Sequence, residues 1–348
     1  MDDILIRKEG CAGRITLNRP QALNALTYAM CLEIDRALIA WAGDPEVALV
    51  LIDAAGERAF CAGGDIAEMY ASGRRGDFGY GRRFWADEYR MNARIADYPK
   101  PVVSFLQGFT MGGGVGVGCH GSHRIVGESA QVAMPECGIG LVPDVGGSFL
   151  LATAPGHLGE YLGTTGTRMG PADAILAGFA DRFVPEANWP ALKARLVGTG
   201  DAGAVEAAAR EVPEGRLAAL RPEVDALFAG ATLADIAGTL AFAGTPFAAD
   251  ALAALSRAAP LSAACTVEMV RRLRGRATMR AALALEYRFT FRSMEHADFI
   301  EGIRAAIIDK DRNPRWCHAG PRTVPAEDVE RMLAPLGADE LTFGEERP

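Results

Sequence analysis

A run of closely spaced glycines, GFTMGGGVGVG at residues 108–118, places the strongest constraint on how this chain can fold. It follows a buried strand predicted at 101–106 (PVVSFL) and begins a predicted helix. Glycine in a helix interior costs up to about 1 kcal/mol relative to alanine, so this density needs a reason. Either the helix packs tightly on a neighbour, or free N–H groups at its positive end face an oxyanion.

A second glycine motif, FCAGGD at residues 60–65, follows a buried strand predicted at 47–53 (VALVLID) and precedes a short predicted helix. Gly63 and Gly64 let the backbone turn tightly and present an N–H group with no Cβ in the way. The alternative is an ordinary strand-to-helix turn in which Asp65 caps the helix. The residues alone leave both interpretations open.

Two carboxylates lie eight residues apart in a third motif, MPECGIGLVPDVGG at residues 134–147. A loop rich in glycine and proline can direct Glu136 and Asp144 into one pocket, where a carboxylate can activate water or attack directly. Two simpler interpretations compete with this one. Glu136 can be a solvated loop residue, and Asp144 can cap a helix that begins near Val145.

A further match, GVGCHG at residues 116–121, fits the G-x-G-x-x-G fingerprint of dinucleotide-binding turns, but its context does not. It starts several residues past the strand, and the segment that follows it, SHRIVGE, is predicted to be a strand rather than a helix. The sequence contains no G-x-x-x-x-G-K-[ST] motif. We therefore expect no nucleotide-binding turn here.

The order of the predicted elements favours an α/β fold with a helical C-terminal part. Strands are predicted at 14–17, 47–53, 101–106, 123–126 and 131–133, and helices at 27–42, 66–70 and 82–97. From about Gly146 onward helical patterns dominate, with alanine-rich segments. We predict one region at 1–200 and a mostly helical region at 201–348.

Composition narrows the class of protein. The formal net charge is -8, which disfavours a nucleic-acid partner, and no apolar run is long enough to predict a transmembrane helix. The seven cysteines are scattered without a CxxC pair, which favours reduced thiols and gives no zinc-type cluster. The first residues, MDDILIRKEG, do not resemble a secretory signal, so a cytoplasmic protein without a membrane partner is expected.

Taken together, FCAGGD, GFTMGGGVG and AMPECGIGLVPDVGG, in this order, resemble the enoyl-CoA hydratase/isomerase, or crotonase, superfamily. The segments ITLNRP and ALNAL near the N-terminus resemble it too. The resemblance implies a crotonase-like ββα spiral core over roughly residues 1–200 that binds an acyl-CoA. It implies no separate cofactor, because CoA is part of the substrate, and a possible homo-oligomer, either a trimer or a hexamer.

The resemblance also assigns roles to backbone amides. In that superfamily two N–H groups hold the thioester oxygen, and the motifs match them to Gly64 and Gly113, with Gly63 beside the first. This assignment agrees with the interpretation of the glycines as donors aimed at developing negative charge. Loss of one donor of such a pair costs roughly 3 kcal/mol of barrier in other enzymes.

Departures from the hydratase pattern narrow the subfamily. A hydratase typically has a glutamate three residues after the second oxyanion glycine, where this chain has Gly116. Its second glutamate matches Glu136, and a position that is usually small is occupied by Asp144. These features resemble the 3-hydroxyisobutyryl-CoA hydrolases, and 3-hydroxypropionyl-CoA is an equally compatible substrate.

Three further segments extend this resemblance to nearly the whole chain: EYRMN from Glu88, FIEGIRA from Phe299 and IDKDRNPRW from Ile308. The resemblance implies that Glu88 lies at the acyl end of the pocket. From the residues alone, Glu88 is one charge on an amphipathic helix, and a solvated side chain is expected. Lys310 and nearby arginines can meet CoA phosphates or simply be solvated.

Two hydrolytic routes and two rival functions remain open. Glu136 can attack the thioester carbonyl to give an anhydride, or Glu136 or Asp144 can act as a general base on water; neither route needs a metal. The first rival is an enoyl-CoA hydratase or isomerase, which the glycine at position 116 disfavours. The second is a CoA-binding protein without catalysis, since fold does not dictate function.

Overall fold

The structure is a computed structural model that describes residues 2–344. Its contacts divide the chain into two compact units that interleave along the sequence. Unit 1 comprises residues 1–65, 90–133 and 168–218, and unit 2 comprises residues 66–89, 134–167 and 219–348. The sequence predicts one boundary near residue 200, whereas each unit of the structure is made of three segments of the chain. The assignment of acyl-CoA binding to residues 1–200 stays a prediction.

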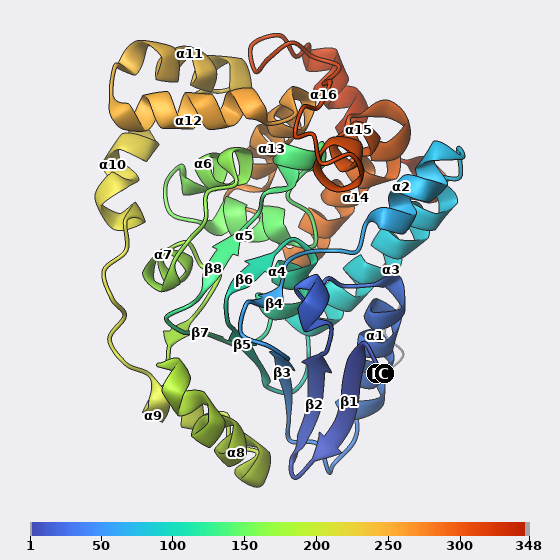
Figure 1. The fold of residues 1–348 in the computed structure, drawn as a ribbon, viewed down its shortest axis with the longest axis vertical. Helices are drawn as coiled ribbons and strands as arrows, with labels where there is room; N and C mark the ends of the chain where they lie inside the picture. The colour runs from blue at the N-terminus through green and yellow to red at the C-terminus, as the bar shows by residue number, and fades with distance from the viewer. Residues whose placement is uncertain (1, 345–348) are drawn as a thin grey trace. The chain divides into compact units, whose positions relative to one another are not determined.

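Unit 1 contains two sheets whose strands are mostly parallel (Figure 1). In the larger sheet β1 and β2 are antiparallel, and every later neighbour is parallel. Its strand order is β1 (Ile4–Glu9), β2 (Ala12–Leu17), β3 (Leu49–Ala54), β5 (Val102–Leu106), β7 (His123–Val126) and β9 (Arg182–Phe183). The smaller sheet has the order β4 (Ala59–Cys61), β6 (Phe109–Met111) and β8 (Gln131–Ala133), all parallel.

The core of unit 1 lies against β3 and β5. Both strands are almost continuously apolar because parallel strands are covered on both faces. Leu51 pairs with Val103, and both belong to a buried cluster with Trp189 of helix α8 (Trp189–Thr199). Helix α1 (Tyr28–Ala42) packs on β2 so closely that a Cβ at Gly13 would lie 2.4 Å from the Trp41 ring.

Glycines in helix α4 (Gly113–Gly118), which follows β6, allow it to pack on the small sheet. A Cβ at Gly114 would lie 2.2 Å from the carbonyl oxygen of Cys61, and one at Gly118 would lie 2.7 Å from the Phe60 ring. The tight-packing interpretation of the glycine run is therefore confirmed for these two positions. Gly113, at the first turn, has a different environment that is described below.

Unit 2 is built from helices (Figure 1). Helix α13 (Pro260–Leu273) is buried along most of its length and contacts α5 (Gly147–Thr153), α6 (Leu158–Thr165), α14 (Met279–His296) and α16 (Ala326–Leu333). The remaining elements named below are α2 (Ala67–Arg74), α3 (Gly79–Ala96), η2 (Glu136–Ile139), α11 (Leu233–Ala243), α12 (Pro246–Arg257), α15 (Phe299–Ile303) and η4 (Arg304–Ile308). The boundary between the units at residues 89 and 90 falls inside α3.

The predicted α/β fold with a helical C-terminal part is confirmed, because the described elements after β9 are all helices. The strands predicted at 123–126 and 131–133 match β7 and β8 residue for residue. The dinucleotide-binding interpretation is excluded, since β7 rather than a helix follows its G-x-G-x-x-G match. Strands β1, β4, β6 and β9 were not predicted, because β4, β6 and β9 are short and the last three residues of β1 are all charged.

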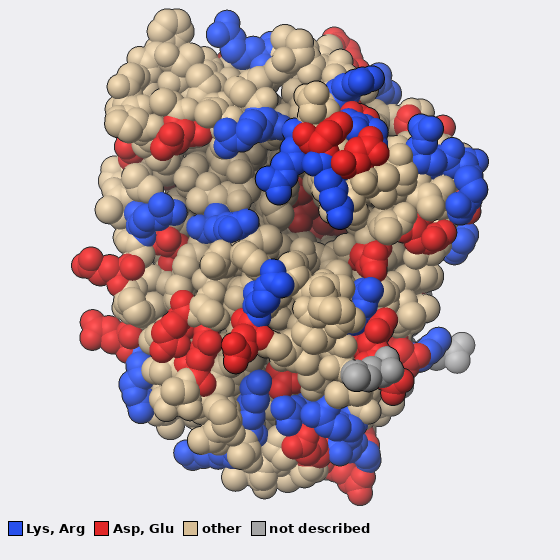
Figure 2. All heavy atoms as spheres, in the orientation of Figure 1, with Lys and Arg blue, Asp and Glu red and all other residues tan. Residues whose placement is uncertain are grey.

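Charged side chains of both signs are interspersed over the face shown in Figure 2. Several form ion pairs, such as Arg304 with Glu301 at 2.8 Å and with Asp311 at 2.7 Å. Among the described residues, every helix is too short or too polar to cross a bilayer. All seven cysteines are free thiols, as the sequence predicts.

Candidate active site

In unit 1 the backbone at Gly63 and Gly64 forms a short parallel bridge with Leu26. The Leu26 N–H donates to the Gly63 carbonyl at 2.9 Å, and the Asp65 N–H donates to the Leu26 carbonyl at 2.8 Å. In this pattern the N–H of Gly64 points away from Leu26. Gly63 has a φ of +123°, a conformation that favours glycine, and this turn leaves the Gly64 amide directed outward.

Asp65 does not cap the following helix. Its carboxylate accepts from Arg19 at 3.1 Å, and the N-cap residue of α2 is Ile66, without a side-chain cap. The simpler interpretation of the FCAGGD motif as a capped strand-to-helix turn is therefore wrong for this side chain. Asp65 instead anchors the turn to the segment before α1.

Gly113 is the first residue of α4, where backbone N–H groups lack partners within the helix. The N–H groups of Val115 and Gly116 both donate to the Gly112 carbonyl, which leaves the amides of Gly113 and Gly114 outside the helical ladder. Gly112 has a φ of +50°, so a glycine is favoured at this turn as well.

The amides of Gly64 and Gly113 follow the carboxyl ends of two adjacent parallel strands, β4 and β6. A Cβ at Gly63 would lie 3.7 Å from the Met111 carbonyl oxygen, so the two turns are in close proximity. Ligands of open α/β sheets bind at this edge. Two outward amides on neighbouring turns are an arrangement that can bind a carbonyl oxygen.

Unit 2 contains a cluster of four buried carboxyl groups, Glu88, Glu136, Asp144 and Glu286, called here the carboxyl cluster. Among the described residues, none of the four forms an ion pair with a lysine, arginine or histidine. Burial raises the pKa of every member, and the charge of Asp144 raises the pKa of the other three further. Four such groups cannot all ionise near pH 7 and must titrate as a coupled set.

Glu136 begins the 3-10 turn η2 directly after Pro135. The turn ends at Gly140, whose φ of +77° and close approach to the Asp298 backbone leave no room for a side chain. Glu136 is buried, which contradicts the solvated-loop interpretation, and its Oε2 has no hydrogen-bond partner among the described residues. A buried carboxylate oxygen without a partner is rare in folded proteins and is available to a ligand.

Asp144 occupies the first position of a tight turn over residues 144–147. The Gly147 N–H donates to the Asp144 carbonyl at 2.7 Å, while Val145 and Gly146 have φ values of +53° and +82°. These angles are those of a type I′ turn, which favours glycine or asparagine. A left-handed conformation costs a non-glycine residue roughly 1–2 kcal/mol, so Val145 is strained.

The side chain of Asp144 is oriented by a tyrosine. The Tyr89 hydroxyl donates to Asp144 Oδ2 at 2.7 Å, and it lies 3.4 Å from the Thr290 hydroxyl. Burial raises the pKa of Asp144 to about 7, and the hydrogen bond from Tyr89 opposes that rise. Asp144 does not cap α5, whose N-cap residue is Gly146, so the capping interpretation is wrong.

Glu88 precedes Tyr89 on α3 and is 4% exposed, so the expectation of a solvated side chain is wrong. Burial raises its pKa well above the ordinary value, and the negative charge of Asp144 raises it further. Tyr89 packs edge-on against Tyr287 of α14, with ring centroids 6.2 Å apart. This packing places the middle of α3, with Glu88, in the interior of unit 2. The amphipathic pattern of α3 alone did not predict this burial.

Sequence reasoning missed Glu286 and Tyr89. Glu286 is fully buried on α14 and accepts hydrogen bonds from the backbone of Gly146 at 2.8 Å and of Ser148 at 3.0 Å. A signal was present, because Glu286 lies three residues from both Leu283 and Phe289 on the apolar face of its helix. Tyr89 lies within the EYRMN segment, but nothing in the sequence indicated that its hydroxyl binds Asp144.

Lys310 was expected either to meet CoA phosphates or to be solvated. It is exposed, with a φ of +57°, in a segment that follows η4. Arg304 holds this segment through ion pairs with Glu301, Asp309 and Asp311. The contact of Lys310 with phosphate stays a prediction.

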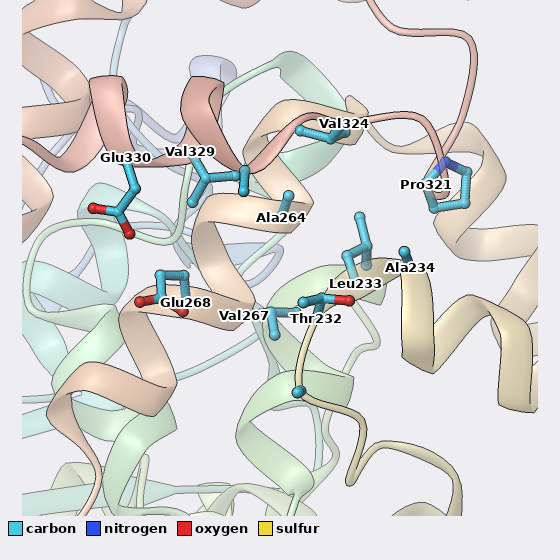
Figure 3. A pocket seen from close by; sticks show the side chains of 12 residues that line it. Thr232, Leu233, Ala234, Ala264, Val267, Glu268, Pro321, Val324, Val329 and Glu330 are labelled. Atoms are coloured by element: carbon cyan, nitrogen blue, oxygen red, sulfur yellow. The ribbon is translucent and has the colours of Figure 1, made fainter.

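A separate pocket of about 180 Å³ lies among α11, α13 and α16 (Figure 3). Its lining is mainly apolar, and its two glutamates, Glu268 and Glu330, are paired with Arg272. None of the candidate site residues lines it. Within residues 2–344, no group of three or more histidine, cysteine or acidic side chains is arranged to hold a metal ion.

The family model for enoyl-CoA hydratase/isomerase matches residues 12–333. This chain belongs to the enoyl-CoA hydratase/isomerase family. The solved structure of an enoyl-CoA hydratase from Rhodobacter sphaeroides is 62% identical, with a TM-score of 0.95, over 98% of this chain and all (100%) of that one. The predicted crotonase-like fold is thereby confirmed.

Other relatives in the family carry different names. The 3-hydroxyisobutyryl-CoA hydrolase, mitochondrial, of Gallus gallus is 37% identical over 97% of this chain and 90% of its own length, and that of Homo sapiens is 35% identical over 98% and 91%. A solved structure named as a carnitinyl-CoA dehydratase from Mycobacterium thermoresistibile is 42% identical, with a TM-score of 0.94, over 99% of this chain and 100% of that chain. The names divide between thioester hydrolysis and addition or removal of water.

We predict that Asp144→Asn changes how stability depends on pH. Folding raises the pKa of Asp144 from 3.8 to about 7, so the folded chain retains a proton that the unfolded chain releases between these values. That contribution to stability is complete below about pH 4 and is lost as the pH rises through 7. Relative to the variant, the free energy of unfolding of the wild type should fall by up to about 4 kcal/mol between pH 4 and pH 8.

Urea unfolding of both proteins at several pH values measures this difference. The introduced asparagine retains an oxygen that can accept from Tyr89, so the comparison isolates the ionisation of the carboxyl group. A difference in the free energy of unfolding that stays constant from pH 4 to pH 8 would show that Asp144 titrates normally.

Proposed function

We propose that this protein hydrolyses an acyl-CoA thioester, with 3-hydroxyisobutyryl-CoA as the leading substrate. The observation that carries the proposal is the pair Glu136 and Asp144: one has a buried oxygen without a partner, and the other is oriented by Tyr89. A carboxylate pair of this kind can deliver water to a carbonyl carbon. The names of the curated relatives support the same substrate.

In the proposed reaction the thioester oxygen accepts hydrogen bonds from the amides of Gly64 and Gly113. Both amides are directed away from their own local hydrogen-bond ladders, which supports their use as donors. Attack on the carbonyl carbon moves negative charge onto this oxygen, and donors already in position stabilise it without reorganising. The CoA thiolate then leaves, and no strong acid is required for its departure.

Two chemical routes lead from the thioester to the free acid and CoA. In the first, an oxygen of the ionised Glu136 carboxylate bonds to the acyl carbon as the carbon–sulfur bond breaks and the CoA thiolate leaves. Water then cleaves the anhydride to give the free acid and restore the carboxylate, and the proton released from water ends on the CoA thiolate. In the second, Glu136 or Asp144 accepts a proton from water while the water oxygen attacks the acyl carbon, and that proton ends on the CoA thiolate. The partnerless Oε2 of Glu136 supports a role for this residue in either route.

Glu88 supports a hydroxyacyl substrate. Its carboxyl is buried on the same helix as Tyr89, and a raised pKa favours the protonated form, which can both donate and accept a hydrogen bond. A hydroxyl on the acyl group can exchange hydrogen bonds with a carboxyl group in this form. The same chemistry accepts 3-hydroxypropionyl-CoA, so the hydroxyl rather than the branch methyl is the recognised feature.

A second candidate function is enoyl-CoA hydration, which the name of the Rhodobacter sphaeroides structure favours. Addition of water across a double bond in this family uses two glutamates. Position 116, where the first would lie, is a buried glycine in α4. A helix position without a side chain supplies no carboxylate, so hydrolysis is the better proposal.

The location of the protein in the cell, its oligomeric state and its contacts with CoA phosphates remain proposals. We propose that the protein acts in the cytoplasm, although the names of the curated relatives include the word mitochondrial. An assembly of three or six copies and contacts from Lys310 to CoA phosphates also stay predictions. A CoA-binding protein without catalysis is the outcome that remains if every thioester is left intact.

The proposal predicts rapid release of CoA thiol from 3-hydroxyisobutyryl-CoA, followed with a thiol-reactive dye. Glu136→Gln and Asp144→Asn should each lower kcat by at least about 100-fold, because an amide is neither the nucleophile nor the base that the carboxylate provides. Glu214→Gln changes an exposed glutamate of a loop and serves as the matched control with unchanged activity. Circular dichroism establishes that each variant is folded.

Crotonyl-CoA is the comparison substrate, followed by loss of its enoyl absorbance. Hydration of crotonyl-CoA without thiol release from either substrate would move the protein to the hydratase function. CoA binding with no reaction on 3-hydroxyisobutyryl-CoA, 3-hydroxypropionyl-CoA or crotonyl-CoA would favour the non-catalytic alternative.

A second prediction concerns the Gly113 amide. Proline is tolerated at the first position of a helix and lacks an N–H, so Gly113→Pro removes the donor while retaining α4. Gly113→Ala retains the donor and is the matched control for added bulk. The proline variant should lose about 100- to 1,000-fold in kcat relative to the alanine variant. Equal kcat values for two folded variants would exclude this amide from the oxyanion site.

A further inference from the structure

Glu286 on α14 is a buried carboxyl that the proposed reaction does not use. It accepts hydrogen bonds from three donors: the Gly146 N–H, the Ser148 N–H and the Ser148 hydroxyl. Two of these donors are backbone amides that lie two and four residues after Asp144. A residue that binds the backbone on the far side of a tight turn controls the direction of the side chain at its start.

The turn that Glu286 binds is conformationally strained. Val145 has a φ of +53°, which a β-branched residue rarely adopts, and Gly146 follows at +82°. Strained residues of this kind persist where many surrounding contacts hold their conformation, and they concentrate at functional sites. The two amides held by Glu286 flank the end of this turn, so they oppose its relaxation to an ordinary extended backbone.

The same helix also reaches the Asp144 side chain. Thr290 lies four residues after Glu286, on the same face of α14, and its hydroxyl is 3.4 Å from that of Tyr89. Tyr89 in turn donates to Asp144 at 2.7 Å. One face of α14 therefore contacts both the backbone that follows Asp144 and the tyrosine that binds its carboxyl.

We propose that Glu286 is a positioning residue that holds the strained turn 144–147 so that the Asp144 carboxyl stays directed at Tyr89. This inference rests on the proposed function, in which Asp144 takes part in thioester hydrolysis. Glu286 does not touch the substrate in this account. It acts through the Gly146 and Ser148 amides, and its loss frees the turn to move Asp144 away from Tyr89.

A different role for Glu286 is simple stabilisation of the first turn of α5, since a carboxylate near a helix N-terminus is favourable. The two roles make different predictions about the Tyr89–Asp144 hydrogen bond. Stabilisation alone lowers the free energy of unfolding and leaves the folded site unchanged. Positioning changes the site in protein that is still folded.

The test replaces the seven tyrosines with 3-fluorotyrosine and follows Tyr89 by ¹⁹F NMR, with the resonance assigned by Tyr89→Phe. Glu286→Gln should shift this resonance, because glutamine keeps only one acceptor oxygen and one of the two backbone N–H groups then loses its acceptor. Unlabelled Glu286→Gln should lose about 10- to 100-fold in kcat with KM within about twofold, as expected for a misplaced group.

Glu160→Gln is the matched control. Glu160 is also a buried glutamate on a helix of unit 2, but it is paired with Arg274 at 2.7 Å and lies outside the carboxyl cluster. Its substitution should lower stability without moving the Tyr89 resonance or kcat. A resonance and a kcat that are unchanged in folded Glu286→Gln would overturn the proposal.

A second variant keeps the test decisive if Glu286→Gln does not fold. Glycine adopts a positive φ freely, so Val145→Gly removes the strain that Glu286 is proposed to hold. In the Val145→Gly protein, adding Glu286→Gln should leave the chemical shift of the Tyr89 resonance unchanged from that of Val145→Gly alone. A double variant that still fails to fold, or whose resonance moves as in the wild-type background, contradicts the proposal.

The NMR measurement needs no turnover, so it separates this inference from the proposed function. A shifted Tyr89 resonance in Glu286→Gln, together with full thiol release by Asp144→Asn, would support the positioning role and reject Asp144 as a catalytic group.

Discussion

The arrangement of unit 2 depends on one constraint: four carboxyl groups are buried together, and none of them is paired with a cationic side chain of residues 2–344. Burial raises the pKa of all four groups, and the negative charge of Asp144 raises the pKa of Glu88, Glu136 and Glu286 further, so the cluster holds protons near neutral pH that isolated carboxyls would release. A purely structural core would not retain such a cluster, because apolar side chains of similar size fill the same volume at lower cost. Its presence therefore supports chemistry that needs carboxyl groups.

Different local structures hold Glu136 and Asp144 in place. Pro135 and Gly140 bound the 3-10 turn that begins with Glu136, while the I′ turn and Tyr89 fix Asp144. In unit 1, two glycine turns after adjacent strands leave amides without local partners. Tight turns at strand ends recur because they direct backbone and side-chain groups outward while the strands themselves stay buried.

Much of this could be predicted from the sequence, because the decisive signals are local. The strands at 123–126 and 131–133 and the glycine turns follow from short patterns of residue type. Glu88 was placed wrongly, since burial of a charge on an amphipathic helix depends on which other helices cover it. Glu286 is far from Asp144 in sequence, so its contacts with the 144–147 turn arise only when α14 packs on α5.

The central claim, that burial without a cation raises the carboxyl pKa values, is tested most directly by NMR. Aspartate labelled with ¹³C at the side-chain carboxyl reports its own ionisation, and Asp144→Asn assigns the resonance. The account predicts that the Asp144 signal titrates with a midpoint of about 7. A midpoint near the ordinary value of 3.8 would contradict it, because the cluster would then be solvated or neutralised and could not act as described.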